Sequence, residues 1–248
     1  MSDFIAAQDR ALLEQHGLAS FDALWALKLE AVDEPNTERG GWSSVYRLDL
    51  GEAAYYLKRQ SNHLTRSLLH PLGEPTFARE FRNIRRYARL GIPALQAAFF
   101  AERHVAGERR AVLVTRALDG WCDLDSLLVG WAERPEAQRR AVLQACGELA
   151  RQLHSAGQMH GCFYPKHIFL RPDGEVYRAQ LIDLEKTRPL LFGRRDRIKD
   201  IEPLFRRTSS SWGDGELQIF LQGYLGGEVA MQCWLDDLAQ RRRYKTAR

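Results

Sequence analysis

The sequence is poor in cysteine and has no long apolar run. Its four cysteines, Cys122, Cys146, Cys162 and Cys233, lack metal-ligand spacing and are too few for a disulfide scaffold, which favours a reducing cytosol. The charge-free stretch at 91–101 is far shorter than the roughly 20 residues of a membrane-spanning helix. The first residues, MSDFIAAQDRALLEQ, lack the basic and then apolar pattern of a signal peptide, so a cytoplasmic protein is expected.

The basic residues are unevenly distributed. The formal net charge is only +4, but arginines and lysines gather at 192–199, at 205–207 and in the tail 240–248. Such clusters favour phosphorylated glycolipids, anionic lipid headgroups or nucleic acid, and a solvated face is the alternative for the tail. Because no recognition-helix or zinc-finger pattern accompanies them, nucleic acid is not an expected partner.

The apolar pattern changes from strands to helices along the chain. Hydrophobic residues make up 45% of the sequence, enough for the core of one large domain or of two lobes. Helical periodicity with apolar residues on one face, at Phe77, Phe81, Ile84 and Ala88, predicts a helix there. The expected helices are 3–16, 21–29 with Ser20 as cap, 74–93, 135–155 and most of the chain after 190; the expected strands are 42–50, 53–59, 96–104, 110–116, 167–170 and 176–184.

Residues 39–59 contain the pattern of a phosphate-binding hairpin. Gly40 and Gly41 at a strand-to-strand turn let backbone amides approach phosphates, Trp42 covers them, and Lys58 on the next strand pairs with them. Glycine pairs followed by a strand lysine are common, so this motif alone is weak. A lysine on a half-buried strand needs a carboxylate partner, which Glu80 on the following helix supplies if it points inward. An exposed Glu80 paired with a neighbouring arginine is the alternative.

Two further stretches carry chemistry. MHGCFYPKHIFL, residues 159–170, has the spacing of a kinase catalytic loop, and LIDLEK, residues 181–186, places Asp183 directly after apolar strand residues. An acidic residue in that position suits a magnesium ion that bridges nucleotide phosphates. Taken by itself, Asp183 is better explained as the cap of a turn. The fixed order of hairpin, lysine, glutamate, loop and aspartate is more specific than any single part.

In this order the motifs resemble the lipopolysaccharide kinase superfamily, relatives of protein kinases that include the core heptose and Kdo kinases, and most closely its InaA-like branch. The resemblance covers residues 35–210, with RGGWSSV, YYLKRQSNHLTRSLLHPLGEPTFARE, RAVLVTRAL, HGCFYPKHIFL and LIDLEKTRPL as matching stretches. It implies an α+β, protein-kinase-like fold with a small β-rich lobe at 1–116, including the N-terminal helices, and a helical lobe at 117–248. It also implies ATP and Mg²⁺ as cofactors and a lipopolysaccharide core or other anionic glycolipid as acceptor, with peripheral contact at the inner membrane left open.

The resemblance assigns roles by position. Asp183 corresponds to the principal magnesium ligand, His167 to the second metal-binding position, and Asp200 to a helix-start aspartate that steadies the catalytic loop. Arg116 and Leu118 correspond to the hinge that offers backbone groups to adenine. The nucleotide-binding positions together are Gly40, Gly41, Trp42, Ser43, Lys58, Glu80, Arg116 and Leu118.

The chain departs from this pattern at the catalytic position. Cys162 stands where the heptose kinases have the aspartate that deprotonates the acceptor hydroxyl, and general base catalysis is typically worth ~10²- to 10⁴-fold. Gly161 replaces the arginine that grips a phosphorylated activation loop, so control by such phosphorylation is not expected. The short basic segment from Asp183 to Asp200 leaves little chain for peptide docking and favours an anionic sugar acceptor.

Two functions therefore follow from the sequence. The leading hypothesis is an ATP- and magnesium-dependent phosphotransferase, in which Cys162, Asp183 and Lys58 occupy the catalytic positions, because phosphoryl transfer rests mainly on positioning and charge neutralisation. The alternative is a pseudokinase that binds nucleotide or a partner without transfer. A basic nucleic-acid-binding module is the least favoured class.

Overall fold

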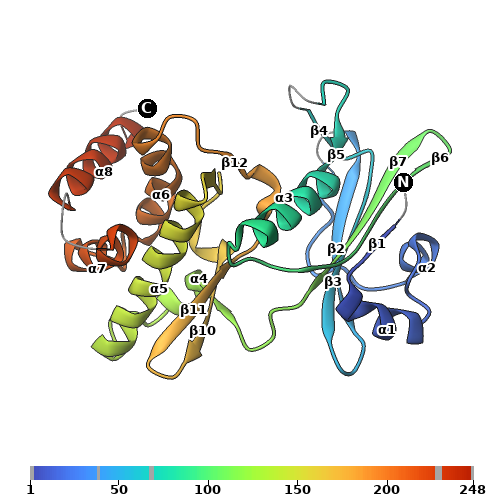
Figure 1. Cartoon of the computed structure of the whole chain (residues 1–248), viewed down its shortest axis with the longest axis horizontal. Coiled ribbons are helices and arrows are strands. Elements are labelled where there is room, and N and C mark those ends of the chain that lie inside the picture. The colour runs from blue at the N-terminus through green and yellow to red at the C-terminus, as the bar shows by residue number, and fades with distance from the viewer. Residues whose placement is uncertain (1–2, 38–39, 67–69, 227–230, 247–248) are drawn as a thin grey trace. The chain divides into compact units, whose positions relative to one another are not determined.

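The computed structural model describes residues 3–37, 40–66, 70–226 and 231–246. Its contacts divide the chain into two compact units (Figure 1). Unit 1 contains residues 1–88 and 95–119, and unit 2 contains residues 89–94 and 120–248. The chain therefore passes into unit 2 for six residues before it returns to complete unit 1.

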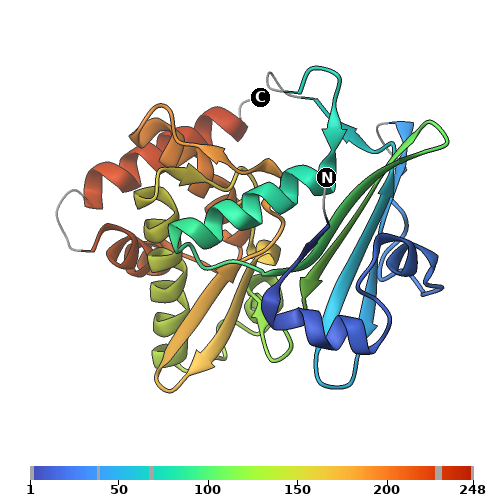
Figure 2. The same cartoon turned by 45° about the vertical axis from the view of Figure 1, so that its right-hand side comes forward.

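Unit 1 is built on an antiparallel five-stranded sheet with the order β1-β6-β7-β3-β2. Alternation along β3 turns Tyr55, Leu57 and Arg59 to one face of the sheet and Lys58 and Gln60 to the other. Helices α1 and α2 pack on the first face, and α3 packs on the second (Figure 2). The strands are β1 Phe4–Ile5, β2 Trp42–Asp49, β3 Ala54–Ser61, β6 Ala97–Val105 and β7 Glu108–Arg116, with the short pair β4 Leu64–Thr65 and β5 Glu74–Pro75 outside this sheet.

The predicted helix at 3–16 is wrong at its start. Phe4 and Ile5 form β1, which pairs with β6, and α1 covers Ala7–Gln15. An unpaired edge of β6 offers backbone hydrogen bonds that one more helical turn does not. The next helix, α2 Phe21–Ala26, has the expected cap, because the Ser20 hydroxyl accepts the Ala23 N–H at 3.3 Å, but it ends three residues early.

Helix α3, Thr76–Leu90, is confirmed as an amphipathic helix. Its buried face includes Phe77, Phe81 and Ile84, and the ring of Phe81 stacks on Phe100 of β6 at 4.3 Å between centroids. The expectation that Ala88 continues this face is wrong, since Ala88 is exposed and Tyr87 takes the buried position in the last turn.

Unit 2 combines small sheets with helices. Strands β8 Cys122–Asp123, β10 Ile168–Asp173 and β11 Val176–Leu181 form a sheet of order β11-β10-β8, and β9 Gln158–Met159 pairs with β12 Arg188–Pro189. The α-helices are α4 Leu124–Leu128, α5 Glu136–Ser155, α6 Arg194–Thr208, α7 Asp214–Leu225 and α8 Met231–Thr246, with 3₁₀ turns at Pro165–His167 and Leu184–Lys186.

Helices α5 and α7 meet through their backbones. A Cβ atom at Gly147 would lie 2.2 Å from the carbonyl oxygen of Phe220, and one at Gly223 would lie 2.8 Å from that of Gln144. Only glycine permits this approach, so the two residues set how closely α5 and α7 pack. Among the residues that the structure describes, none of these helices is both long and apolar enough for a transmembrane segment.

Candidate active site

The first functional group lies in unit 1 and is an ion pair. Lys58 Nζ of β3 lies 2.6 Å from Glu80 Oε1 of α3, with the lysine side chain 17% and the glutamate side chain 3% exposed. Glu80 thus points inward and pairs with Lys58, as expected, and the alternative of an exposed residue is wrong. The buried carboxylate holds the Lys58 ammonium in one orientation. Because the ammonium has three N–H donors and is partly exposed, it can still donate to a further anion.

A residue that the sequence analysis did not single out fixes this geometry. Gln60, two positions after Lys58 on the same face of β3, is fully buried, and its Oε1 accepts the Phe77 N–H at 2.7 Å at the start of α3. Its Nε2 donates to the His63 carbonyl at 2.7 Å. Gln60 therefore sets the position of α3 on β3 and, through it, the position of Glu80. One indication of this role was present in the sequence: Gln60 follows Lys58 by two positions, so the two side chains of a strand lie on the same face.

The glycine-rich segment precedes β2. Asn36 and Ser43 exchange backbone hydrogen bonds of 2.8 and 2.9 Å, so Gly40 and Gly41 lie in the turn between two paired segments. Gly40 has φ +75° and open space around it, whereas a Cβ at Gly41 would overlap the backbone of residues 61–63. Gly40 therefore has the freedom expected of a phosphate loop, and Gly41 is required by close packing. The ring of Trp42 contacts that of Trp25, with 5.7 Å between centroids.

The expected adenine-binding hinge follows β7. The Arg116 N–H donates to the Gln96 carbonyl, and the Ala117 N–H donates to the Ala54 carbonyl. Neither bond uses the Arg116 carbonyl or the backbone of Leu118, which are among the groups expected to contact adenine. The Arg116 side chain pairs with the buried carboxylate of Asp9 at 2.7 Å. Helix α1 thereby anchors the end of β7, next to the residues expected to form the hinge.

The catalytic-loop stretch lies in unit 2, and Asp200 organises it. Its two carboxylate oxygens accept the N–H groups of His160 and Gly161, both at 2.7 Å. His154 Nε2 lies 3.1 Å from the same carboxylate, and His154 Nδ1 lies 2.8 Å from the Tyr224 hydroxyl. The expected contact between Asp200 and the loop is present, but the expected position is wrong, because Asp200 lies in the middle of α6 and not at its start.

Hydrogen bonds also join this loop to the segment that carries Asp183. His160 Nε2 donates to the Ile182 carbonyl at 2.9 Å, and the Ile182 N–H donates to the His167 carbonyl at 3.1 Å. Asp183 comes directly after, with the left-handed backbone angles φ 56° and ψ 62°. A non-glycine residue in this region is strained, and such strain concentrates at functional positions.

The geometry of His167 and Asp183 suits a cation. His167 Nδ1 lies 2.9 Å from the Cys162 carbonyl, which only accepts, so Nδ1 carries the proton. Burial lowers the pKa of His167 despite the opposing charge of Asp183, which leaves a neutral ring with a bare Nε2 3.3 Å from Asp183 Oδ2. Two acceptors facing each other at this distance favour a cation that both contact.

These two residues do not form a complete metal cage. Among the described residues, no group of three or more histidine, cysteine, aspartate or glutamate side chains could hold a metal ion. Mg²⁺ typically takes one or two protein carboxylates and completes its octahedron with phosphate and water oxygens. The carboxylate of Asp183, 41% exposed, fits that arrangement, and the imidazole of His167 is a less usual partner.

Cys162 is a neutral thiol in a polar surrounding. It is 3% exposed, and burial raises its pKa, so the thiolate is scarcer than in a free cysteine at neutral pH. The nearby charge of Lys186 lowers this pKa, but burial outweighs it. The pKa of Lys186 is raised by its interaction with Cys162, so the amine is charged. The sequence analysis missed Lys186, although it lies within the LIDLEK motif.

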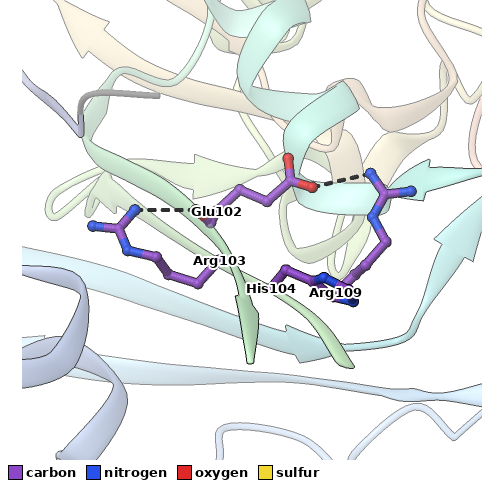
Figure 3. Close-up of a pocket in the computed structure, with 4 residues that line it drawn as sticks. All are labelled: Glu102, Arg103, His104 and Arg109. Carbon is purple, nitrogen blue, oxygen red and sulfur yellow. Dashed lines mark hydrogen bonds and ion pairs between the residues drawn. The ribbon is translucent and has the colours of Figure 1, made fainter. Parts of the chain in front are cut away.

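Unit 1 also contains a hollow of about 350 Å³ beside β6 and β7, lined by Glu102, Arg103, His104 and Arg109 (Figure 3). Arg109 lies 3.0 Å from Glu102 Oε1 and donates to Gly73 O at 2.7 Å, and Arg103 donates to the Glu102 carbonyl. Both arginines are thus already paired with groups of the protein, so their presence in the hollow is explained without a bound ligand.

Comparison with known proteins identifies the family. The sequence profile of the lipopolysaccharide kinase (Kdo/WaaP) family matches residues 22–224. The chain belongs to this family. It is 34% identical over 179 residues to Protein InaA of Escherichia coli K12, a match that covers 71% of this chain and 82% of that protein. It is 30% identical over 191 residues to the lipopolysaccharide core heptose(I) kinase WaaP of Pseudomonas aeruginosa, covering 65% of this chain and 67% of the kinase.

The fold of a lipopolysaccharide kinase is also present. A solved structure of WaaP in complex with acyl carrier protein superimposes with a TM-score of 0.73 at 22% identity, over 98% of each chain. The expected α+β, kinase-like fold is therefore confirmed, and so is the resemblance to the InaA-like branch. The family implies use of ATP, usually with a divalent metal.

Proposed function

We propose that this protein is an ATP- and magnesium-dependent phosphotransferase whose acceptor is an inner-core sugar of lipopolysaccharide or a similar anionic glycolipid. The observation that carries the proposal is the Lys58–Glu80 pair, 2.6 Å apart on β3 and α3. Burying a carboxylate beside a lysine costs desolvation free energy, and an anion that the lysine binds would explain why the pair is kept. Family membership indicates that this anion is the phosphate chain of ATP.

Each residue then has a defined task. Lys58 pairs with the phosphates, and the open backbone at Gly40 lets amide groups approach them. Asp183 and His167 would hold Mg²⁺, which neutralises charge on the phosphates when bound. Asp200 keeps the loop of Cys162 and His167 in place through two backbone bonds.

The acceptor end of the reaction differs from that of a heptose kinase with an aspartate. The neutral thiol of Cys162 is a poor proton acceptor, so the chain lacks an efficient base at this position. Lys186 supplies a positive charge beside Cys162, and we infer that it contacts the transferring phosphate or an anionic group of the acceptor. A slow kinase is the expected result, acting in the cytoplasm where ATP is available.

The second candidate is a nucleotide-binding pseudokinase with a regulatory or scaffolding role. The observation that favours it is the raised pKa of Cys162, because a missing base is compatible with binding and incompatible with fast transfer. Both candidates require nucleotide, so binding is tested first and transfer second.

Thermal-shift titration tests nucleotide binding. ATP should raise the melting temperature of the wild type only with magnesium, and Lys58→Ala and Asp183→Asn should weaken the shift. The exposed residues Lys28 and Asp125 offer matched controls, Lys28→Ala and Asp125→Asn, which should leave it unchanged. Absence of a shift at millimolar ATP would exclude both candidates.

Phosphoryl transfer separates the two candidates. Purified protein is incubated with labelled ATP, magnesium and truncated lipopolysaccharide cores, and the label is followed into the glycan. Transfer that is lost in Asp183→Asn supports the kinase. Nucleotide binding without transfer to any core supports the pseudokinase.

A further inference from the structure

An apolar tip projects from unit 2 just before α6. Leu191 is 70% exposed and Phe192 is 63% exposed, and among the described residues they are the only exposed large hydrophobic side chains that are adjacent in sequence. Single exposed apolar residues are ordinary on protein surfaces. A leucine and a phenylalanine side by side in solvent are less so, because each loses stabilisation that burial would provide.

The tip is held in place by the fold. The buried carboxylate of Asp196 accepts the N–H groups of Leu191 and Phe192 at 2.9 and 3.2 Å. Leu190 donates to the Gly157 carbonyl at 2.9 Å, and Gly193 turns the chain into α6 with φ +50°. These bonds fix the backbone of the tip, and this fixed backbone keeps the two side chains in solvent.

Arginine side chains lie next to the apolar tip. The guanidinium of Arg195 lies 5.6 Å from the ring of Phe192, and Arg195 also lines a hollow of about 440 Å³ between α6 and α8. We call this the arginine hollow; its lining is Arg194, Arg195, Ile198, Asp237, Gln240 and Arg241. Asp237 pairs with Arg194 at 2.7 Å and is the single carboxylate against three guanidinium groups. The hollow therefore carries excess positive charge beside the apolar tip.

We propose that the Leu191–Phe192 tip and the arginine hollow form a docking surface for an anionic phospholipid bilayer. Two apolar side chains offer far too little area for a stable protein interface, which buries about 800 Å² on each partner. The same pair is suited to insertion at the level of the headgroups, where basic residues add about fivefold in affinity each. The proposal goes beyond phosphoryl transfer, because docking requires neither nucleotide nor acceptor.

Vesicle co-sedimentation without nucleotide tests the docking surface. The wild type should bind phosphatidylcholine vesicles that contain about 30 mol% phosphatidylglycerol, and binding to pure phosphatidylcholine should be far weaker, since most of the affinity is electrostatic. Arg194→Gln with Arg195→Gln should weaken binding about 25-fold, at about fivefold per arginine. Leu191→Ser with Phe192→Ser should weaken it at least about tenfold while the melting temperature is unchanged.

The β10–β11 hairpin supplies a matched charge control. Arg171 and Arg178 are exposed on this hairpin, which lies at the end of unit 2 away from α6 and α8 (Figure 1). Arg171→Gln with Arg178→Gln removes the same charge and should bind vesicles like the wild type. Equal losses from both double variants would mean that net charge alone drives binding, and the proposed surface would be wrong.

Fluorescence tests insertion directly. Phe192→Trp should shift to shorter wavelength on anionic vesicles and be quenched by brominated acyl chains, after the wild-type signal of its six tryptophans is subtracted. Val176→Trp, at an exposed position on the β10–β11 hairpin, should show neither effect.

Three further results would overturn the proposal: no binding of the wild type to anionic vesicles, identical signals from the two tryptophan variants, or full displacement by soluble phosphorylated core oligosaccharide. The last result would identify the surface as an acceptor site. Because no ATP is present, these results do not depend on whether the protein transfers phosphate.

Discussion

At the scale of single residues, Cys162 decides how the active site differs from that of a kinase with an aspartate base. Its thiol is buried and its pKa is raised, yet the charged amine of Lys186 is near enough to oppose that rise. A carboxylate at position 162 would therefore be buried beside a cation and would avoid most of the cost of an unpaired charge.

Cys162→Asp should consequently fold and should raise the rate of transfer by up to about 100-fold, the low end of a general base's usual effect. Cys162→Ser should change the rate little. The measurement is the initial rate with a truncated core as acceptor, together with the melting temperature.

A second variant tests the partner. In Cys162→Asp with Lys186→Gln the carboxylate has lost its cation, so we expect a lower melting temperature than in either single variant. If Cys162→Asp with Lys186→Gln is as stable as Cys162→Asp alone, Lys186 does not pair with the residue at position 162.

At the scale of elements, α3 carries Glu80 and makes polar contacts with β3 and β5. Gln60 binds the first turn of α3, and Glu74 of β5 forms a bidentate ion pair with Arg82 of α3. The first contact lies at the start of the helix and the second at Arg82, so the two flank Glu80 along α3 and hold the segment that carries it.

Gln60→Met keeps the size of the side chain and removes its hydrogen bonds. It removes the partner of the Phe77 N–H, whereas the His63 carbonyl keeps the N–H and hydroxyl of Thr76. The cost is therefore roughly 1 to 3 kcal/mol, which corresponds to a melting temperature lower by about 3 to 9 °C. Gln8→Met, at an exposed position, is the control and should have little effect. An unchanged ATP-induced shift in Gln60→Met would show that Gln60 does not position Glu80.

The Glu74–Arg82 pair predicts a pH dependence. Burial opposes ionisation of Glu74, but Arg82 outweighs it and holds the pKa of the carboxyl below its usual 4.5. A lowered pKa in the folded state means that the stabilisation is complete above the unfolded pKa and is lost as pH falls through the folded one. The difference in melting temperature between wild type and Glu74→Gln should therefore be constant above about pH 5 and shrink in acid. A difference that grows on acidification would contradict this assignment.

At the scale of the whole molecule, unit 2 is not a contiguous piece of chain. Residues 89–94 belong to it, and Pro93 accepts the N–H of Leu181, which is fully buried at the edge of β11. A parallel bridge between Ala94 and Leu181 continues this contact. A cut at the boundary near residue 120 would remove the partner of a buried backbone group.

Two fragments test this connection. A fragment of residues 120–248 should be less stable, by about 1 to 3 kcal/mol, than one in which residues 89–94 are joined to residue 120 through a flexible linker. Urea unfolding followed by circular dichroism measures the difference. Equal midpoints would mean that residues 89–94 contribute nothing to unit 2.

The sequence by itself determined most of the repeating structure. Aromatic and β-branched residues on either side of short turns predicted β2, β3, β6 and β7. The 3.6-residue pattern of apolar residues predicted α3 and α5, because residues on one face of a helix recur with that period. The order of motifs was sufficient to indicate the family that the comparisons then showed. It also indicated Glu80 as a partner for Lys58, since a half-buried lysine requires a counter-charge, and the structure decided against an exposed Glu80.

Only the tertiary structure decided which distant side chains meet. The residues around Phe4 and Ile5 did not predict a strand, because the edge of β6 that pairs with them is formed by residues about a hundred positions later. The contacts of Gln60 with α3 and of Lys186 with Cys162 likewise join segments that are separate in sequence. Leu191 and Phe192 read as ordinary apolar residues until the fold left them in solvent. Side-chain partners depend on how elements pack, and packing is a property of the whole chain.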